Sequence, residues 1–338
     1  GGAVALKALL LAESGIESPA SRCRVIHYVP HLLREGIDAE VVTGMPSWGD
    51  ILRKASAADV VLVQRRALPV AKLFALRAKT RRLVFDFDDS IWLKRAKDGV
   101  IVPVRLPRRL RLRATLRRSD AIVAGNSYLA AWAGGVAPGV PVSVLATPIE
   151  AADYARATPR APDGRVVIGW VGAKDNLRYL DAIAPALQEI VRRHPQVVVR
   201  VVCNAPWEAA GVPVENVRWS LAEEIPNIAA SDLGVMPLED DDWTRGKCGF
   251  KAIQFLGTGQ AVVCSPVGMN VDVVTDGENG FLARGTAEWV EALEKLVVDP
   301  ALRRRMGGAG RERVARAFDA RVIATRLAGV LRGDPAGV

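Results

Sequence analysis

The chain has 338 residues, half of them apolar and a quarter charged, which excludes a disordered or fibrous protein and is typical of a folded soluble one. A single domain usually has about 100–200 residues, so the length predicts two domains. The four cysteines are far apart and have no zinc-binding spacing, which indicates free thiols in a reducing compartment. No signal peptide and no uncharged apolar run of membrane-spanning length is visible, and we expect a cytoplasmic protein.

The net charge of +9 is unevenly distributed. Seven arginines lie between residues 105 and 118, interleaved with leucine, isoleucine and valine from 101 onward. Such a segment is a solvated helix face, a groove for nucleic-acid phosphates, or a surface for anionic lipid headgroups. Aromatic side chains are absent from it, which argues against a platform for single-stranded nucleic acid.

Apolar runs of strand length alternate with amphipathic segments of helix length, which predicts parallel sheets covered by helices on both faces. In the first half the expected strands are Ala5–Ala12, Ala39–Thr43, Val60–Gln64, Arg82–Asp86, Ala121–Gly125 and Val142–Ala146. The expected helices between them are Ser21–Glu35, Trp48–Ala55, Leu68–Lys79, Leu106–Arg118 and Ser127–Ala133.

After Thr147 and Pro148, the segment 155–163 is rich in Pro, Ala and Thr and is the expected linker. The pattern then restarts with strands Val166–Val171, Val197–Cys203, Leu233–Met236 and Ala261–Ser265, and helices Leu177–Arg193, Ala222–Ala229, Lys251–Gly257 and Ala287–Val297. One or two long helices are expected over Arg303–Leu331. The fold class is therefore α/β, with two doubly wound, Rossmann-like domains of residues 1–154 and 155–317 that face each other across a cleft.

In doubly wound sheets ligands bind outside the carboxyl ends of the strands, so the loops there carry the candidate site. The strand that ends at Val171 runs into Gly172, Ala173 and Lys174 directly before a helix, an arrangement that lets backbone amides approach a phosphate. The alternative is a tight strand-to-helix turn with no ligand.

The segment Trp243–Gln254 combines Arg245, Lys247 and Lys251 with glycines before a helix, which indicates a pyrophosphate-binding loop. Lys251 would contact phosphate, and Gln254, three residues later on the same helix face, would bond a ribose hydroxyl. The alternative is a solvated basic turn. We expect this second loop to face the sugar and phosphates, with a third strand-end loop, Ser265–Asn270, nearby.

In the first half, Phe85–Trp92 ends a strand with three carboxylates. Such a cluster can hold magnesium, but the basic loop already supplies positive charge for phosphates, so no metal is required. We expect Asp88 and Asp89 to bind sugar or acceptor hydroxyls, with helix capping as the alternative. The acidic run 239–242 is expected to be a solvated loop. No Ser/His/Asp or Cys/His nucleophile arrangement emerges.

These motifs resemble the GT-B retaining glycosyltransferases of the GT4 type. The resemblance rests on Ser21–Arg24, Phe85–Trp92, Asp120–Leu129, Ile168–Gly172, Trp243–Gly268 and Asn279–Leu282. It implies a GT-B fold whose C-terminal helix, 318–338, returns to the first domain. It also implies transfer of a sugar from a UDP-, GDP- or similar nucleotide sugar with retention, without a metal or a protein nucleophile.

The chain departs from the family's pattern at several positions. Many relatives carry two glutamates eight residues apart, which contact the donor sugar and the ribose; Gly246 and Gln254 stand there in this chain. Lys251 resembles a variant of the motif with lysine at that position. Asp88 stands where many relatives place a histidine, and Lys174 and Arg178 only approximate an Arg/Lys pair of the family.

The combined prediction is a glycosyltransferase that acts on a glycan, lipid-linked or small-molecule acceptor, as in polysaccharide biosynthesis. The alternatives are a sugar-nucleotide epimerase of GT-B fold and a non-catalytic binding protein. We expect no nucleic-acid partner, and a peripheral contact of 105–118 with anionic lipid on the inner face of the cytoplasmic membrane.

The predicted donor residues are Gly172, Lys174, Arg245, Lys247, Gly249, Phe250, Lys251, Gln254, Gly268 and Met269. The predicted catalytic residues are Asp88, Asp89, Arg245 and Lys251, and the predicted acceptor-facing residues are Gln64, Arg65, Arg22 and Arg24.

Overall fold

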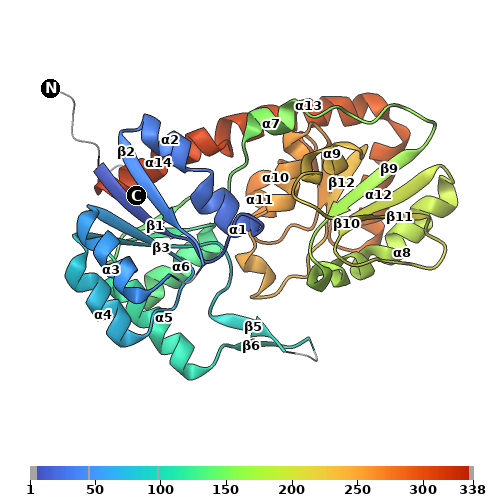
Figure 1. Cartoon of the computed structure of the whole chain (residues 1–338). Coiled ribbons are helices and arrows are strands. Elements are labelled where there is room, and N and C mark those ends of the chain that lie inside the picture. The colour runs from blue at the N-terminus through green and yellow to red at the C-terminus, as the bar shows by residue number, and fades with distance from the viewer. Residues whose placement is uncertain (1–5, 45, 97–98, 335–338) are drawn as a thin grey trace. The chain divides into compact units, whose positions relative to one another are not determined.

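A computed structural model of the chain describes residues 6–44, 46–96 and 99–334 (Figure 1). The chain divides into two compact units. Unit 1 comprises residues 1–148, 245–248 and 320–338, and unit 2 comprises residues 149–244 and 249–319. The first division falls after Pro148, six residues before the predicted boundary, and four residues of the predicted donor loop belong to unit 1.

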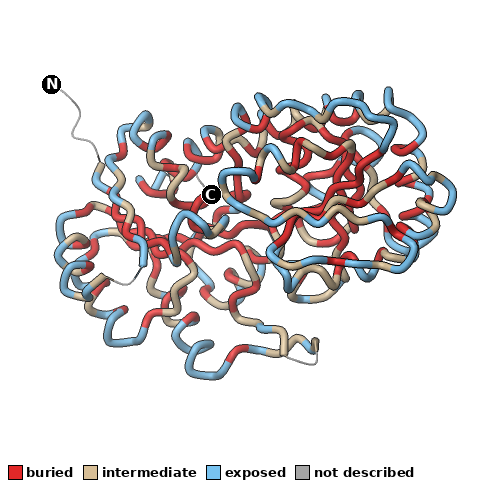
Figure 2. Tube along the Cα trace, turned by 45° about the vertical axis from the view of Figure 1, so that its right-hand side comes forward, coloured by how far each residue is buried: buried red, intermediate tan, exposed pale blue. Residues whose placement is uncertain are grey.

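Unit 1 is built on a sheet of six parallel strands in the order β2-β1-β3-β4-β7-β8. The strands are β1 (Leu6–Leu11), β2 (Ile37–Val42), β3 (Val60–Gln64), β4 (Arg82–Phe87), β7 (Ala121–Ala124) and β8 (Val142–Val144). Every residue of β3 is buried, as expected for a parallel strand covered by helices on both faces. Figure 2 shows the buried stretches concentrated in the strands of this unit.

The helices of unit 1 are α1 (Pro19–Ser21), α2 (Val29–Arg34), α3 (Trp48–Ala57), α4 (Val70–Lys79), α5 (Leu106–Arg118), α6 (Ser127–Val136) and α14 (Ala320–Arg332). The single helix predicted over Ser21–Glu35 is wrong: a π-helical turn, η1 (Arg22–Ile26), separates α1 from α2. Pro30 explains the break, because proline has no amide hydrogen and is tolerated only in the first turn of α2. A short hairpin, β5 (Leu93–Arg95) with β6 (Ile101–Pro103), was not predicted.

Unit 2 contains a second sheet of six parallel strands, in the order β11-β10-β9-β12-β13-β14. Counted along the unit this is the order 3-2-1-4-5-6 of dinucleotide-binding folds. The strands are β9 (Val166–Val171), β10 (Val197–Cys203), β11 (Val214–Arg218), β12 (Leu233–Met236), β13 (Ala261–Cys264) and β14 (Gly280–Leu282). The helices are α7 (Ala151–Ala155), α8 (Arg178–Arg193), α9 (Glu224–Ala229), α10 (Phe250–Gly257), α11 (Asn270–Val273), α12 (Thr286–Val298) and α13 (Pro300–Ala317), with a 3₁₀ turn η2 (Lys174–Asn176).

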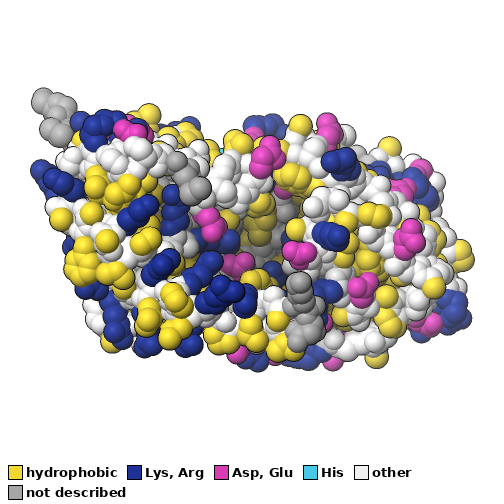
Figure 3. Space-filling view, turned by 60° about the horizontal axis from the view of Figure 1, so that its bottom comes forward, with side chains coloured by type: hydrophobic (Ala, Val, Ile, Leu, Met, Phe, Trp, Pro, Cys, Tyr) yellow, Lys and Arg dark blue, Asp and Glu magenta, His cyan; other side chains and the backbone are white. Residues whose placement is uncertain are grey.

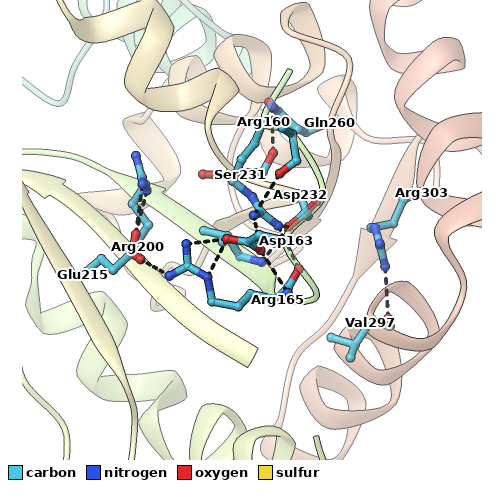
Figure 4. A network of polar contacts seen from close by, with 12 residues as sticks. Arg160, Asp163, Arg165, Arg200, Glu215, Ser231, Asp232, Gln260, Val297 and Arg303 are labelled. Atoms are coloured by element: carbon cyan, nitrogen blue, oxygen red, sulfur yellow. Dashed lines mark hydrogen bonds and ion pairs between the residues drawn. The ribbon is translucent and has the colours of Figure 1, made fainter. Parts of the chain in front are cut away.

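The predicted linker 155–163 is held firmly within unit 2 (Figure 4). Arg160 donates hydrogen bonds to Asp163 (2.6 Å), to Asp232 (2.7 Å) and to the carbonyl of Arg165 (2.8 Å). Arg165 in turn pairs with Glu215 at 2.6 Å. These contacts join the segment to the amino ends of β9 and β12, opposite the loops of the candidate site.

The last helices of the chain belong to different units. Helix α13 lies in unit 2, whereas α14 lies in unit 1 beside α2. Arg82, at the start of β4, donates two hydrogen bonds to the carbonyl of Val330. Residues 335–338 of the predicted C-terminal helix lie outside the described residues. Among the described helices, none combines the length and the apolar character that crossing a bilayer requires.

Candidate functional site

The sheet order of unit 2 reverses between β9 and β12, and this topological switch point is where doubly wound folds bind ligands. The carboxyl end of β9 leads to Gly172, and that of β12 leads to the loop 237–244. The first of these loops contains the predicted donor residue Gly172, and the second leads into the predicted donor segment Trp243–Gln254.

Gly172 lies against the side chains of Trp170 and Lys251. A Cβ atom at Gly172 would stand 2.6 Å from the Trp170 ring and 2.8 Å from Cε of Lys251, so only glycine fits. The Nζ atom of Lys251 lies 5.8 Å from the centroid of the Trp170 ring, within the range of a cation–π interaction. Unit 2 therefore brings two predicted donor residues, Gly172 and Lys251, together at the switch point, with a buried tryptophan beneath them.

The loop after β12 is held in one conformation. The Thr244 amide donates to Asp241 Oδ1 (2.7 Å), and the Asp241 amide donates to Thr244 Oγ1 (3.1 Å). Glu239 accepts two hydrogen bonds from Arg178, at 3.0 and 3.1 Å. The acidic run 239–242 is thus not simply a solvated loop, because two of its side chains fix the loop that leads into the basic segment.

The third predicted loop packs beside the start of α10. Gly249, in the left-handed region with φ 64°, has the backbone of Met269 and the side chain of Asn270 as near neighbours. Gly268 also has a positive φ, 56°, and Met269 is buried. Gly249, Gly268 and Met269 are therefore grouped in unit 2, as the donor-site prediction requires.

Two other predicted donor residues have partners inside unit 2. Gln254 is buried, and its Nε2 donates to the hydroxyl of Tyr154 at 2.8 Å. Lys174 is exposed in η2, and its backbone amide donates to Oδ1 of Asn204 at 3.0 Å. The ribose contact of Gln254 stays a prediction, and sequence reasoning missed its partner Tyr154.

Unit 1 has its own switch point, between β1 and β3, and Arg65 lies directly beyond the end of β3. Arg65 has φ 53°, which is strained for a residue with a side chain. Its Nε donates to Asp88 at 2.5 Å, and its other nitrogens lie 3.5 Å from Glu13 and 3.8 Å from Asp89. Burial alone would lower the pKa of the Arg65 guanidinium, but Asp88 and Asp89 outweigh burial and raise this pKa.

Three of the residues predicted to face an acceptor are structural instead. Arg24 is fully buried; it forms a two-point ion pair with Asp86, at 3.0 and 2.6 Å, and donates to the carbonyl of Leu145. Gln64 is fully buried, with its amide bonded to Glu13, Ser21 and Ala20. Arg22 is buried and donates to the carbonyl of Ile16. Long polar side chains beside a predicted site suggested ligand contact, but these three side chains are buried and hydrogen-bonded within unit 1.

The partly exposed polar groups at this switch point are Arg65, Asp89 and Glu13, whose side chains are 19%, 26% and 38% exposed. Sequence reasoning missed Glu13. It could have been found from its position directly after the first predicted strand. Ligands bind at the carboxyl ends of the two strands that flank a switch point, so this position is as good a candidate as the one after the third strand.

The basic segment Arg245–Cys248 belongs to unit 1, although it interrupts the sequence of unit 2. The Nδ2 atom of Asn126 donates to the carbonyls of Arg245 and Lys247, both at 3.1 Å. The Cys248 thiol donates to the carbonyl of Asp88 at 3.2 Å, and burial raises the pKa of this thiol, which keeps it protonated as a donor. The structure therefore separates the predicted donor residues: Arg245 and Lys247 are in unit 1, and Gly172 and Lys251 are in unit 2.

The carboxylates of unit 1 lie beside arginines rather than in an open cage. Within residues 6–44, 46–96 and 99–334, no three His, Cys, Asp or Glu side chains form a group that could hold a metal ion. Asp86 faces Arg24 and Asp88 faces Arg65, so their charges are balanced by guanidinium groups. Independence from metal stays a prediction.

Residues 165–299 match the family described as Glycosyl transferases group 1. A D-inositol 3-phosphate glycosyltransferase of Rhodococcus erythropolis is 27% identical over 168 residues, which are 44% of this chain and 37% of that protein. The protein of the same name from Corynebacterium jeikeium is 30% identical over 162 residues, 42% of this chain and 37% of that protein. The matched region thus spans little more than a third of each relative's length.

Solved structures match almost the whole chain at low identity. HepE of Anabaena, solved in complex with UDP-glucose, has a TM-score of 0.70 and 15% identity, and the match covers 97% of this chain and all of that chain. Sucrose-phosphate synthase from Thermosynechococcus elongatus has a TM-score of 0.70 and 14% identity, with 98% of this chain covered. These likenesses confirm the predicted α/β class and the GT-B fold with its two Rossmann-like domains.

Proposed function

We propose that the protein is a glycosyltransferase that transfers a sugar from a nucleotide-diphosphate sugar with retention of anomeric configuration. The observation that carries this proposal is the glycosyltransferase family match over unit 2, together with Gly172, Trp170 and Lys251 gathered at that unit's switch point. HepE was solved with UDP and with UDP-glucose, so UDP-sugars are the first donors to test. The comparisons favour this activity over the sugar-nucleotide epimerase.

The chemistry that we propose needs positioning and charge stabilisation rather than a protein nucleophile. When the bond from the sugar to the diphosphate breaks, negative charge grows on the leaving phosphate, and Lys251 in unit 2 is placed at the switch point to stabilise it. Because Gly172 has no side chain, a phosphate could approach the backbone there closely, although the Gly172 amide itself donates to the carbonyl of Val202. No metal takes part in this proposal.

For the acceptor we propose the polar group of unit 1. Arg65, Asp89 and Glu13 are partly exposed and offer both hydrogen-bond donors and acceptors, as recognition of a polyhydroxylated molecule requires. Asp88 would act mainly through Arg65, which it holds at 2.5 Å. The relatives named for D-inositol 3-phosphate are consistent with a polyol acceptor, and glycan or lipid-linked acceptors share its hydroxyl chemistry.

A thermal melt against UDP-, GDP-, ADP- and dTDP-sugars tests the donor site. A ligand at 100 times its dissociation constant stabilises the native state by about 2.7 kcal/mol, so one nucleotide class should raise the melting midpoint. Lys251→Ala should abolish the shift, and Lys295→Ala, an exposed lysine on α12, should retain it. Midpoints unchanged by every donor, or no product with any acceptor, would favour the non-catalytic binding protein.

We also propose that unit 1 contacts anionic lipid on the cytoplasmic face of a membrane. Helices α4 and α5 contain no acidic residue, and both expose apolar side chains: Val70, Phe74, Leu106 and Leu110 are 50–61% exposed. Arg118 of α5 lies 4.3 Å from the ring centroid of Phe74, so the two helices are adjacent there. Over unit 1, at the left of Figure 3, basic and hydrophobic side chains are interspersed with few acidic ones. This combination is typical of interfacial binding.

Vesicle sedimentation tests the membrane contact. The protein should pellet with vesicles of phosphatidylglycerol and phosphatidylcholine, and not with phosphatidylcholine alone. Arg109→Glu with Arg113→Glu should abolish pelleting. Arg304→Glu with Arg305→Glu changes the net charge equally on exposed positions of α13 and should not. Equal pelleting of both double variants would contradict a specific contact by α5.

A further inference from the structure

The segment Arg245–Cys248 leaves unit 2 and is bound by side chains of unit 1. Asn126 is the central contact, because its buried side chain both caps a helix and binds the segment. Its Oδ1 accepts the amide of Leu129 at 2.9 Å and so caps α6. Its Nδ2 donates to the carbonyls of both Arg245 and Lys247.

Two glycines allow this close contact. A Cβ atom at Gly246 would stand 2.1 Å from Oγ of Ser90 and 3.0 Å from its backbone nitrogen. A Cβ atom at Gly125 would stand 2.4 Å from Sγ of Cys248 and 3.0 Å from Asp88. At both glycines the segment and the neighbouring residues of unit 1 therefore pack too closely for a Cβ atom.

We infer that Asn126 is a positioning residue for the basic segment: unit 1 fixes the backbone that carries Arg245 and Lys247, and anion binding by these two cations depends on that unit. The inference rests on the proposed function, in which the cations of this loop bind the phosphates of a nucleotide. Asn126 would contact no ligand itself. It would set the direction of Arg245 and Lys247 through the carbonyls on either side of Gly246.

The two tasks of Asn126 can be separated by substitution. Asn126→Asp keeps a side-chain oxygen that can cap α6 and removes the N–H donor to the segment. Ser47→Ala removes a comparable cap, that of α3, and leaves the segment untouched. Gly246→Ala adds a methyl group that would collide with Oγ of Ser90, and it leaves the cap of α6 unchanged. Ser90→Ala removes that Oγ atom, which is the atom nearest to the new methyl group.

Limited trypsin digestion reports directly on the segment, because Arg245 and Lys247 are themselves cleavage sites. Loss of two hydrogen bonds should raise the population of the open segment about tenfold or more, and cleavage after Arg245 and Lys247 with it. We expect this increase in Asn126→Asp and Gly246→Ala but not in Ser47→Ala. Ser90→Ala should partly restore resistance in the Gly246→Ala background.

Titration with UDP supplies the second measurement. We expect Asn126→Asp to weaken UDP binding about fivefold or more, measured at a temperature at which the variant is still folded, because a buried carboxylate beside two carbonyl oxygens also lowers the melting midpoint. Unchanged cleavage in Asn126→Asp overturns the inference, as does faster cleavage with unchanged UDP affinity. If the wild-type protein binds neither UDP nor another nucleoside diphosphate, the proposed function fails, and the cleavage measurement alone supports or overturns the role of Asn126 in positioning the segment.

Discussion

Removing one partner of the buried ion pair between Arg24 and Asp86 should destabilise unit 1 more than removing one partner of an exposed ion pair. Both side chains are almost completely excluded from water. Replacing Arg24 with methionine keeps an apolar chain of similar length but leaves the Asp86 carboxylate buried without its partner. Removing one member of a buried pair usually costs about 3–5 kcal/mol. With a urea m-value of about 2 kcal/mol per molar, the midpoint should fall by roughly 2 M.

The loss of stability caused by Arg24→Met should also depend on pH. Burial raises the pKa of the Asp86 carboxyl, and Arg24 opposes this effect. Without Arg24 the effect of burial loses its main opposing charge, so the folded-state pKa of Asp86 rises further above its unfolded value of about 3.9. A group with a raised folded-state pKa favours folding at low pH and loses that contribution as the pH rises. Arg24→Met should therefore lose less free energy of unfolding at pH 5 than at pH 8.

Urea unfolding followed by tryptophan fluorescence at pH 5 and pH 8 measures both effects. Arg53→Met is the matched control, because Arg53 pairs with Asp50 at 3.8 Å with both side chains more than half exposed. Exposed pairs contribute about 0–1 kcal/mol, so this control should barely move the midpoint at either pH. The reasoning would be refuted if Arg24→Met lost no more free energy of unfolding than the control, or if it lost the same amount at the two pH values.

Two further substitutions test unit 2. Gly172→Ala should cost roughly 1–3 kcal/mol of stability through overpacking and weaken nucleotide binding, because its methyl group would displace Lys251. The control Gly308→Ala, on α13 with open space around it, should leave calorimetric affinity unchanged. Asp163→Asn should flatten the fall of the melting midpoint as the pH drops from about 5 to about 2, on either side of the unfolded pKa of about 3.9. Hydrogen bonds from Arg165 lower the pKa of Asp163, so its contribution is present above the unfolded pKa and is lost as the pH falls; equal pH profiles would contradict this.

The strands of both sheets were predictable because parallel strands covered on both faces consist of continuous apolar residues. β3 and β12 were predicted with the observed bounds, and each is buried along its whole length. β11 was missed because it lies at the edge of its sheet, where polar residues alternate with valine and no apolar run marks it. The helix over Ser21–Glu35 was predicted from periodicity alone, without the effect of Pro30.

The candidate site was predictable where the chain passes directly from a strand to a glycine. Gly172 directly follows β9 at the switch point, whereas Gly268 lies four residues after the end of β13. Arg24 and Gln64 show the limit of such reasoning. A sequence shows that a polar residue stands near a strand end, but not whether neighbours distant in the chain, such as Asp86 and Ser21, have already taken its hydrogen bonds.

The absence of a glutamate at position 246 raised the possibility of a degenerate site, and the packing around Gly246 argues against it. Any side chain there would collide with Ser90, and Gly125 and Asn126 are shaped around the same segment. A site that had merely lost its glutamate would retain space for it, since deletion of a side chain leaves a cavity. Here the space is filled, and the backbone carrying Arg245 and Lys247 is bonded on both sides of the glycine. Under the proposed function, the contact to the sugar that a glutamate makes in many relatives would therefore come from another residue.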